Sequence, residues 1–302
     1  MLVGNLHCMS GFVIVSGGDS AYFPLAKELC ASVEAASPVG QVAFGFIDGG
    51  LTHIERAWLL ERGTQVVRPQ LPAVARKAIQ ERPGLAVALA RPWLDTFFPQ
   101  YRTIIWLDAD SWVQRWNAID LLVGAAETGA LAIVPGSGRS WTRQIDVRWL
   151  LGGVRGLGQV RSFNFKNAWN ARLPLGICRD VGSRAELNVG VFALRRDAPH
   201  WSRSREWQAR ILPYGKPFTA DQLAMALMTY VDRLPTELLP ASCNYLSPRR
   251  VDPVAVTLLE SYYPYPPVGI VHLGGEKRMR FDPSVIVPLL GLDDRKYQAS
   301  LR

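Results

Sequence analysis

Residues 101–114 read YRTIIWLDADSWVQ, and the rest of the chain is organised around them. The run Thr103–Leu107 is almost entirely apolar and rich in β-branched and aromatic residues, which is typical of a strand buried on both faces of a parallel sheet. Asp108 and Asp110 follow it directly. Because ligands of open α/β sheets bind beyond the carboxyl ends of the strands, we expect this pair of carboxylates to lie at a binding site.

The two carboxylates repel each other unless a cation lies between them. Carboxylate oxygens are hard ligands of the kind that Mg²⁺ or Mn²⁺ prefers, and both ions keep open positions for substrate phosphates. The alternative is a pair of solvated aspartates at a strand end. An Asp-x-Asp motif alone is too short to decide between these interpretations.

Composition limits the class of protein. The chain has 302 residues, of which 48% are hydrophobic and 20% charged, enough for one large α/β domain or two small ones. The N-terminal residues lack a basic segment, so we expect no signal peptide, and the four scattered cysteines indicate a reducing, cytoplasmic location. The net charge of +8 favours anionic partners: a nucleotide, a phospholipid surface or nucleic acid.

Expected strands and helices alternate along the first half of the chain, which predicts a doubly wound sheet. The expected strands are 12–15, 41–46, 64–67 and 130–135, and the expected helices are 24–36, 53–62, 85–98 and 117–126. The turn Ser16–Ser20 contains two glycines that would let a backbone approach a ligand, although a tight turn with nothing bound fits equally well. Neither a dinucleotide-binding nor a P-loop motif is present.

Residues 136–184 are rich in glycine and arginine and have the least regular pattern. We expect an insert of short helices and mobile loops that forms a lid or a wall on the acceptor side. Basic residues interleaved with aromatic ones also fit single-stranded nucleic acid. The lack of any nucleic-acid-binding signature disfavours that alternative.

Two later motifs place polar residues where a core would be apolar. In the expected strand 187–194, Asn188 and Gly190 share one face, which suits the approach of a sugar or metal, or else a solvent-facing edge strand. Asp221 and Gln222 open a helix. Thr219 with Gln222 matches a capping box, and Asp221 suits the helix dipole, so a structural interpretation explains this pair without a ligand.

His272 ends a short apolar strand and is followed by glycines and two cations. Imidazole beside paired carboxylates is a normal ligand set for Mn²⁺. The backbone at Gly275 would reach a phosphate, and Lys277 or Arg278 would neutralise it. A histidine without function at a strand end is the alternative.

Taken together, these motifs resemble glycosyltransferase family 8, whose members have the GT-A fold and are retaining enzymes that use UDP-sugars. The resemblance covers about residues 12–281, and an arginine seventeen residues before the Asp-x-Asp, Arg91, is also similar to the family. The motifs, in the family's order, are Asp108-Ala109-Asp110, Asn188-Val189-Gly190, Asp221-Gln222, and His272-Leu273-Gly274-Gly275 with Lys277-Arg278.

The resemblance implies a single α/β domain of the GT-A class, Rossmann-like, with a doubly wound mixed sheet flanked by helices. Its parts would be a nucleotide-binding half at 12–135, the irregular insert at 136–184, a sugar and acceptor half at 185–281, and a C-terminal tail at 282–302.

The resemblance also implies roles for single residues. The divalent metal, Mn²⁺ or Mg²⁺, would be held by Asp108, Asp110 and His272. Arg91 would contact the donor phosphate or sugar, while Asn188, Asp221 and Gln222 would surround the transferred sugar, with Gly190 beside it. Asp19 is the local candidate for a uracil contact. The family's last motif is altered here: Arg278 has the lysine spacing and Lys277 lies one residue early, so either could bind phosphate.

The function expected from these implications is metal-dependent transfer of a hexose from a UDP-sugar, with retention. The acceptor could be a saccharide, a lipid-linked group or a protein, and the basic charge allows peripheral contact with the anionic inner face of a membrane. One alternative is a sugar-1-phosphate nucleotidyltransferase, although Ser16–Ser20 lacks the basic residue that enzyme class would need. The other is an inactive protein that binds nucleotide or nucleic acid.

Overall fold

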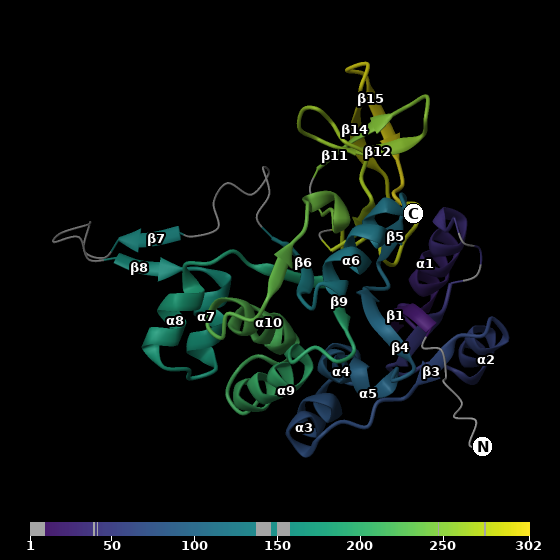
Figure 1. The fold of residues 1–302 in the computed structure, drawn as a ribbon. Coiled ribbons are helices and arrows are strands. Elements are labelled where there is room, and N and C mark those ends of the chain that lie inside the picture. The colour runs from purple at the N-terminus through teal and green to yellow at the C-terminus, as the bar shows by residue number, and fades with distance from the viewer. Residues whose placement is uncertain are drawn as a thin grey trace.

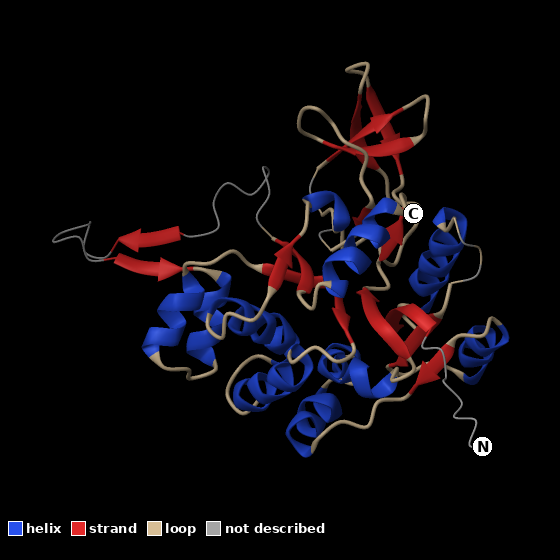
Figure 2. Cartoon of the chain, in the orientation of Figure 1, coloured by secondary structure: helices blue, strands red, loops and turns tan. Residues whose placement is uncertain are grey.

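The computed structural model describes residues 10–38, 40, 42–136, 146–149, 158–246, 248–274 and 276–302 (Figure 1). Within them a seven-stranded sheet has helices on both sides (Figure 2). β9 is antiparallel to β4 and β6, and the other neighbouring strands are parallel, so the expected doubly wound mixed sheet is confirmed. In sheet order the strands are β10 (Thr236–Leu238), β6 (Leu131–Pro135), β9 (Leu187–Arg195), β4 (Tyr101–Leu107), β1 (Ser10–Gly18), β2 (Phe44–Asp48) and β3 (Gln65–Val67).

The central strand β4 is buried on both faces, as its sequence predicts. Ile104 and Trp106 belong to one apolar core, and Ile105 and Leu107 belong to the other, because successive side chains of a strand point to opposite faces. The helices that cover these two cores include α4 (Leu85–Ala90), α9 (His200–Ile211) and α10 (Ala220–Tyr230) on the first, and α1 (Phe23–Ala36) and α6 (Asn117–Glu127) on the second.

The helix expected over residues 85–98 is divided at Pro92. A 3₁₀ turn, η1 (Arg91–Trp93), lies between α4 and α5 (Leu94–Phe97), since proline supplies no backbone N–H to an α-helix. This turn leaves Arg91 buried at the start of η1. Two further helices, α2 (His53–Glu61) and α3 (Ala73–Glu81), complete this half of the chain, and the sequence pattern did not indicate α3.

The insert combines a strand pair with two helices. β7 (Asp146–Trp149) pairs with β8 (Gly158–Arg161), and α7 (Phe163–Asn170) and α8 (Leu175–Gly182) follow. The two helices are the short helices expected there. Residues 137–145 and 150–157, on which most of the expectation of mobile loops falls, lie outside the described residues.

Residues 249–299 build a second, smaller sheet, which stands apart from the large one at the top of Figure 1. Its order is β12 (Thr257–Glu260), β11 (Arg249–Asp252), β14 (Val287–Gly291) and β15 (Lys296–Ala299). Residues 282–302, expected as a tail, therefore contribute two strands. A separate pair, β5 (Ser111–Val113) with β13 (Ile270–His272), and the turns η3 (Pro217–Thr219) and η4 (Ala241–Cys243) complete the fold.

Cys30, Cys178 and Cys243 are buried free thiols, and Cys8 lies outside the described residues. Among the helices of the described residues, none has both the length and the apolar character that crossing a membrane requires.

Candidate metal and nucleotide site

The first carboxylate of the site lies where β4 ends. Because β9 runs opposite to β4, the first residues of β9 reach the same edge of the sheet as the carboxyl end of β4. The N–H of Asp108 donates to the carbonyl oxygen of Gly190 at 2.7 Å. The motifs around Asp108 and Asn188, eighty residues apart in the chain, are thus joined by a backbone hydrogen bond.

The second carboxylate and the histidine are brought together by the strands β5 and β13. Asp110 directly precedes β5, and His272, the last residue of β13, pairs with Ser111. The N–H of Leu273 also donates to the carbonyl oxygen of Asp110 at 2.8 Å. The antiparallel pairing therefore fixes the imidazole beside the Asp-x-Asp turn.

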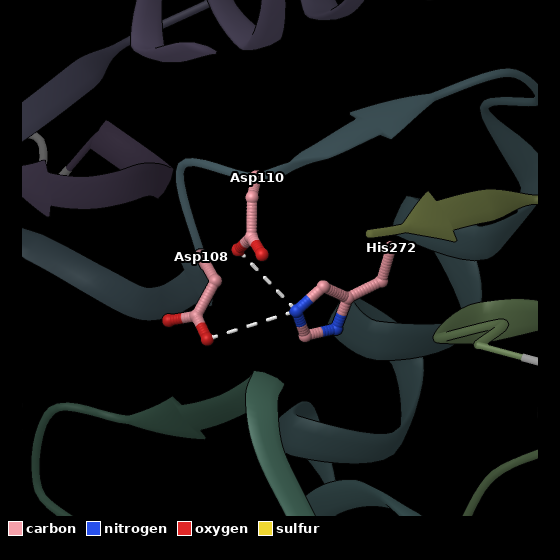
Figure 3. Close-up of side chains that lie close together, drawn as sticks. All are labelled: Asp108, Asp110 and His272. Carbon is pink, nitrogen blue, oxygen red and sulfur yellow. Dashed lines mark ion pairs between the residues drawn. The ribbon is translucent and has the colours of Figure 1, made fainter. Parts of the chain in front are cut away.

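Figure 3 shows the three side chains converging on one point. His272 Nε2 lies 3.4 Å from Asp110 Oδ1 and 3.9 Å from Asp108 Oδ2, and one ligand atom from each residue lies within 4.8 Å of the others. Asp110 and His272 are buried, with 5% and 4% of their surfaces exposed. Two carboxylate oxygens and one imidazole nitrogen are a donor set that suits Mn²⁺ or Mg²⁺.

The orientation of His272 suits a metal ligand. Its Nδ1 lies 2.8 Å from Asn244 Oδ1, and both atoms are buried. An amide oxygen only accepts, so Nδ1 carries a proton, and Nε2 is the ring nitrogen that faces the carboxylates. Such a partner on the far ring nitrogen is the usual companion of a metal-bound histidine. The sequence pattern did not single out Asn244.

Two arginines hold the outer oxygens of the carboxylates. Arg91 forms an ion pair with Asp108 Oδ1, which also accepts from Trp106 Nε1 at 2.8 Å. Arg280 Nε lies 2.7 Å from Asp110 Oδ2. In each aspartate the remaining oxygen faces His272 Nε2, so the residues present fit a bound cation.

The charges of the cluster affect Asp110 directly. Burial alone would raise the pKa of Asp110, but His272 and Arg280 outweigh burial and hold that pKa below its usual range. The carboxylate is therefore ionised at neutral pH, as a metal ligand must be.

Gly190 is required by the close approach of β9 to the cluster. A Cβ atom at this position would lie 2.3 Å from His272 Cε1 and 2.9 Å from Asp108 Oδ2. Its neighbour Asn188 is half-buried, and its Oδ1 accepts the N–H of Gly190 at 2.9 Å. The glycine thus leaves room for Asp108 and His272, and the oxygen of the Asn188 amide is satisfied within its own strand.

Asp221 is buried, with 2% of its surface exposed. Its Oδ1 accepts the N–H of Gln222 at 2.8 Å, and its Oδ2 forms an ion pair with Arg91, so Arg91 bridges Asp221 and Asp108. Burial raises the pKa of Asp221, and Arg91 opposes that rise. The guanidinium also lies over the ring of Trp106, 4.8 Å from its centroid.

The capping box expected at the start of α10 is wrong. Thr219 makes no side-chain hydrogen bond to the helix, and its hydroxyl donates to Asn167 Oδ1 at 3.1 Å. Gln222 instead turns toward β9, where its Nε2 donates to Glu186 Oε1 at 2.6 Å and to the carbonyl oxygen of Leu187 at 2.9 Å. Sequence reasoning missed Glu186.

The two cations expected to bind phosphate follow the strand that ends at His272. Lys277 and Arg278 are exposed in the turn after β13, and Gly275 lies outside the described residues. Arg280, which sequence reasoning passed over, is the cation of this turn that reaches Asp110. Met279 is fully buried. An apolar residue within a basic run was the sequence feature that could have indicated that this turn packs against a core.

Asp19 lies at the carboxyl end of β1, on the same edge of the sheet. Its Oδ1 accepts the N–H groups of Ala21 and Tyr22 at 3.1 and 3.2 Å. The described contacts of Asp19 thus stabilise the start of α1.

The fold is that of the GT-A glycosyltransferases. The galactosyltransferase LgtC, solved with donor and acceptor sugar analogues, superimposes with a TM-score of 0.52 and 16% identity over 87% of each chain. An active-site mutant of LgtC gives a TM-score of 0.51 and 17% identity over the same shares. WbbM, a bifunctional glycosyltransferase, gives 0.51 and 12% identity over 78% of this chain and 40% of its own. No protein-family model and no curated protein sequence matches the chain. The likeness to these structures confirms the expected GT-A fold.

Proposed function

We propose that this chain is a metal-dependent glycosyltransferase that transfers a hexose from a UDP-sugar to an acceptor hydroxyl. The observation that carries the proposal is the convergence of Asp108 Oδ2, Asp110 Oδ1 and His272 Nε2 at the edge of a GT-A sheet. Three protein ligands leave further positions of a divalent cation for diphosphate oxygens.

The metal would be held by these three atoms. When bound, Mn²⁺ or Mg²⁺ supplies Lewis-acid stabilisation of the leaving diphosphate. The protein's part is to keep the ligands charged and aimed. Arg91 and Arg280 hold the outer carboxylate oxygens, and Asn244 fixes the imidazole tautomer. Lys277 and Arg278, exposed in the following turn, are the proposed contacts of the diphosphate.

Retention of configuration is proposed through attack on the same face as the departing diphosphate. Both oxygens of Asp221 are already engaged, by Arg91 and by the N–H of Gln222, which argues against a covalent sugar intermediate on this carboxylate. Gln222, Asp221 and Asn188 would line the sugar, and Asp19 would lie near the uracil.

The acceptor would be a hydroxyl of a saccharide, a lipid-linked group or a protein. The enzyme would be cytoplasmic, and the net charge of +8 would favour its contact with the anionic inner face of a membrane.

The test is release of UDP from a panel of UDP-hexoses, measured with Mn²⁺ and with EDTA. We expect release only with metal. His272→Ala should lower the rate of UDP release more than about 100-fold. Loss of a residue that only hydrogen-bonds a metal ligand lowers metal affinity or activity about 10–100-fold, and loss of the ligand itself should lower it more. His53→Ala, at an exposed position on α2, is the matched control. Equal rates in EDTA would overturn the metal role. Pyrophosphate formed from UTP and a sugar-1-phosphate would identify a nucleotidyltransferase instead.

A further inference from the structure

We propose that Glu186 is a positioning residue that fixes the side-chain amide of Gln222 with its oxygen toward the sugar. The inference rests on the proposed function and adds to it a residue that none of the four motifs contains. Glu186 immediately precedes β9, two residues before Asn188.

The hydrogen bonds of Gln222 determine which way its amide points. Gln222 Nε2 lies 2.6 Å from Glu186 Oε1 and 2.9 Å from the carbonyl oxygen of Leu187. A carbonyl oxygen can only accept, so the nitrogen of the amide must face β9. Both of its hydrogens are then used. The amide oxygen takes part in neither bond, and in the part of the chain that the structure describes it receives no hydrogen bond.

The frame that holds Glu186 is rigid. Leu187 is fully buried and pairs with Pro135 of β6, which fixes the carbonyl oxygen on which Gln222 rests. The carbonyl oxygen of Glu186 accepts the N–H of Gly136. No arginine or lysine of the described residues pairs with the Glu186 carboxylate, which is partly desolvated, and Gln222 is its described side-chain partner. Burial raises the pKa of Glu186, and the bond from Gln222 opposes that rise.

The direction of the amide matters for transfer. As the bond to diphosphate breaks, the sugar carbon gains positive charge. An amide oxygen carries the negative end of its dipole, so a fixed oxygen stabilises that charge, whereas a rotated amide would turn its positive N–H groups toward it. Glu186 therefore acts through Gln222, and its loss should lower kcat while leaving substrate binding unchanged.

A double-mutant cycle tests this with Glu186→Ala, Gln222→Ala and the double variant, using turnover of the UDP-hexose that the native chain accepts. We expect Glu186→Ala to lower kcat at least about tenfold, with KM within about twofold, and the double variant to match Gln222→Ala, because residues acting as one unit are not additive. Glu186→Gln can still present an oxygen to Gln222 and should keep most of the activity. Glu81→Ala, at an exposed position on α3, is the control. Additive losses, or a change in KM alone, would overturn the proposal.

The side-chain amide signal of Gln222, assigned by its loss in Gln222→Ala, gives a readout that needs no turnover. In nuclear magnetic resonance spectra of the ligand-free protein, one amide proton should be shifted downfield and exchange slowly. That behaviour should persist in Glu186→Gln and disappear in Glu186→Ala. An identical signal in native and Glu186→Ala protein would overturn the role of Glu186. A native chain with the expected signal but no turnover of any nucleotide sugar would overturn the proposed function instead.

Discussion

β9 lies so close to His272 and Asp108 that position 190 has no room for a side chain. We predict that Gly190→Ala keeps the fold but displaces His272, because the new Cβ would lie 2.3 Å from His272 Cε1. Displacement of the His272 imidazole should weaken metal-dependent UDP binding by about 10–100-fold. This is the range observed when a residue that hydrogen-bonds a metal-binding side chain is lost. Calorimetry with Mn²⁺ measures this affinity. Gly11→Ala, also in a strand but with no atom within 4 Å of the new Cβ, is the control. Native affinity in Gly190→Ala would show that the cluster has room to adjust.

Asp221 is a buried partner of Arg91, and the proposed function also gives it the task of positioning the sugar. Because Asp221 is buried and paired with Arg91, Asp221→Asn should lower the free energy of unfolding by about 1–3 kcal/mol, less than complete loss of a buried pair since Arg91 keeps Asp108. The sugar would also lose a group that positions it, so turnover per folded molecule should fall on the order of 100-fold. Chemical denaturation and steady-state kinetics give the two values. Full activity with lowered stability would leave Asp221 only a structural partner of Arg91.

At the scale of elements, the turn between β13 and β14 determines where Arg280 lies relative to Asp110. The side chain of Arg302 is 5% exposed and ties this turn to α1: Nη1 donates to the carbonyl oxygens of Met279 at 3.1 Å and Arg280 at 3.0 Å, while Nε and Nη2 lie 3.0 and 2.7 Å from the Glu28 carboxylate. The position of Arg280 therefore depends on contacts made from a distant element.

We predict that Arg302→Gln lowers the free energy of unfolding by about 1–3 kcal/mol, the usual value of a hydrogen bond to a charged group in a site of this kind. Release of Arg280 should also weaken metal-dependent UDP binding several-fold. Thermal denaturation and calorimetry measure the two effects. Arg295→Gln, whose side chain is 82% exposed, is the control. Lowered stability with native UDP affinity would separate this contact from the site.

The elements that sequence reasoning found are those with a local pattern. β4, β9, α6 and α10 each carry a buried apolar run or a helical stripe, so their existence could be predicted. A short strand ending at His272 was also expected, but its pairing with β5 was not, because each strand has three residues and the two lie far apart in the chain. Without that pairing, the partner of His272, Asn244, had no visible role.

The same limit explains the false capping box. Thr52 with Glu55 and Thr219 with Gln222 have the same spacing, but only the first pair forms the motif. Thr52 is extended, with φ −68° and ψ 165°, whereas Thr219 ends a 3₁₀ turn with φ −115° and ψ 10°. A capping residue needs the extended backbone, and the preceding Pro217 turn removes it. Residue spacing therefore predicts a possible capping box, but the backbone conformation of the preceding turn determines whether the capping box forms.

At the scale of the whole molecule, the cluster joins two parts of the chain. Asp108 follows β4 of the large sheet, while His272 belongs to the segment that leads into the small sheet. A ligand that binds all of these residues is bound only by the folded chain. It should stabilise the folded state by about 2.7 kcal/mol when its concentration is 100 times its Kd.

For 302 residues, an unfolding entropy of about 2.1 cal/mol/K per residue converts that gain into a rise in Tm of about 4 °C. We predict this rise for UDP with Mn²⁺, and a much smaller one for UMP with Mn²⁺, because UMP has no diphosphate to share the cation. UDP with EDTA should leave Tm nearly unchanged, as should UDP with Mn²⁺ on His272→Ala, whereas His53→Ala should behave as the native chain does. The same rise in Tm for UDP in EDTA would mean that the nucleotide binds without a metal at Asp108, Asp110 and His272. The metal would then have no part in the stabilisation of the folded chain by UDP.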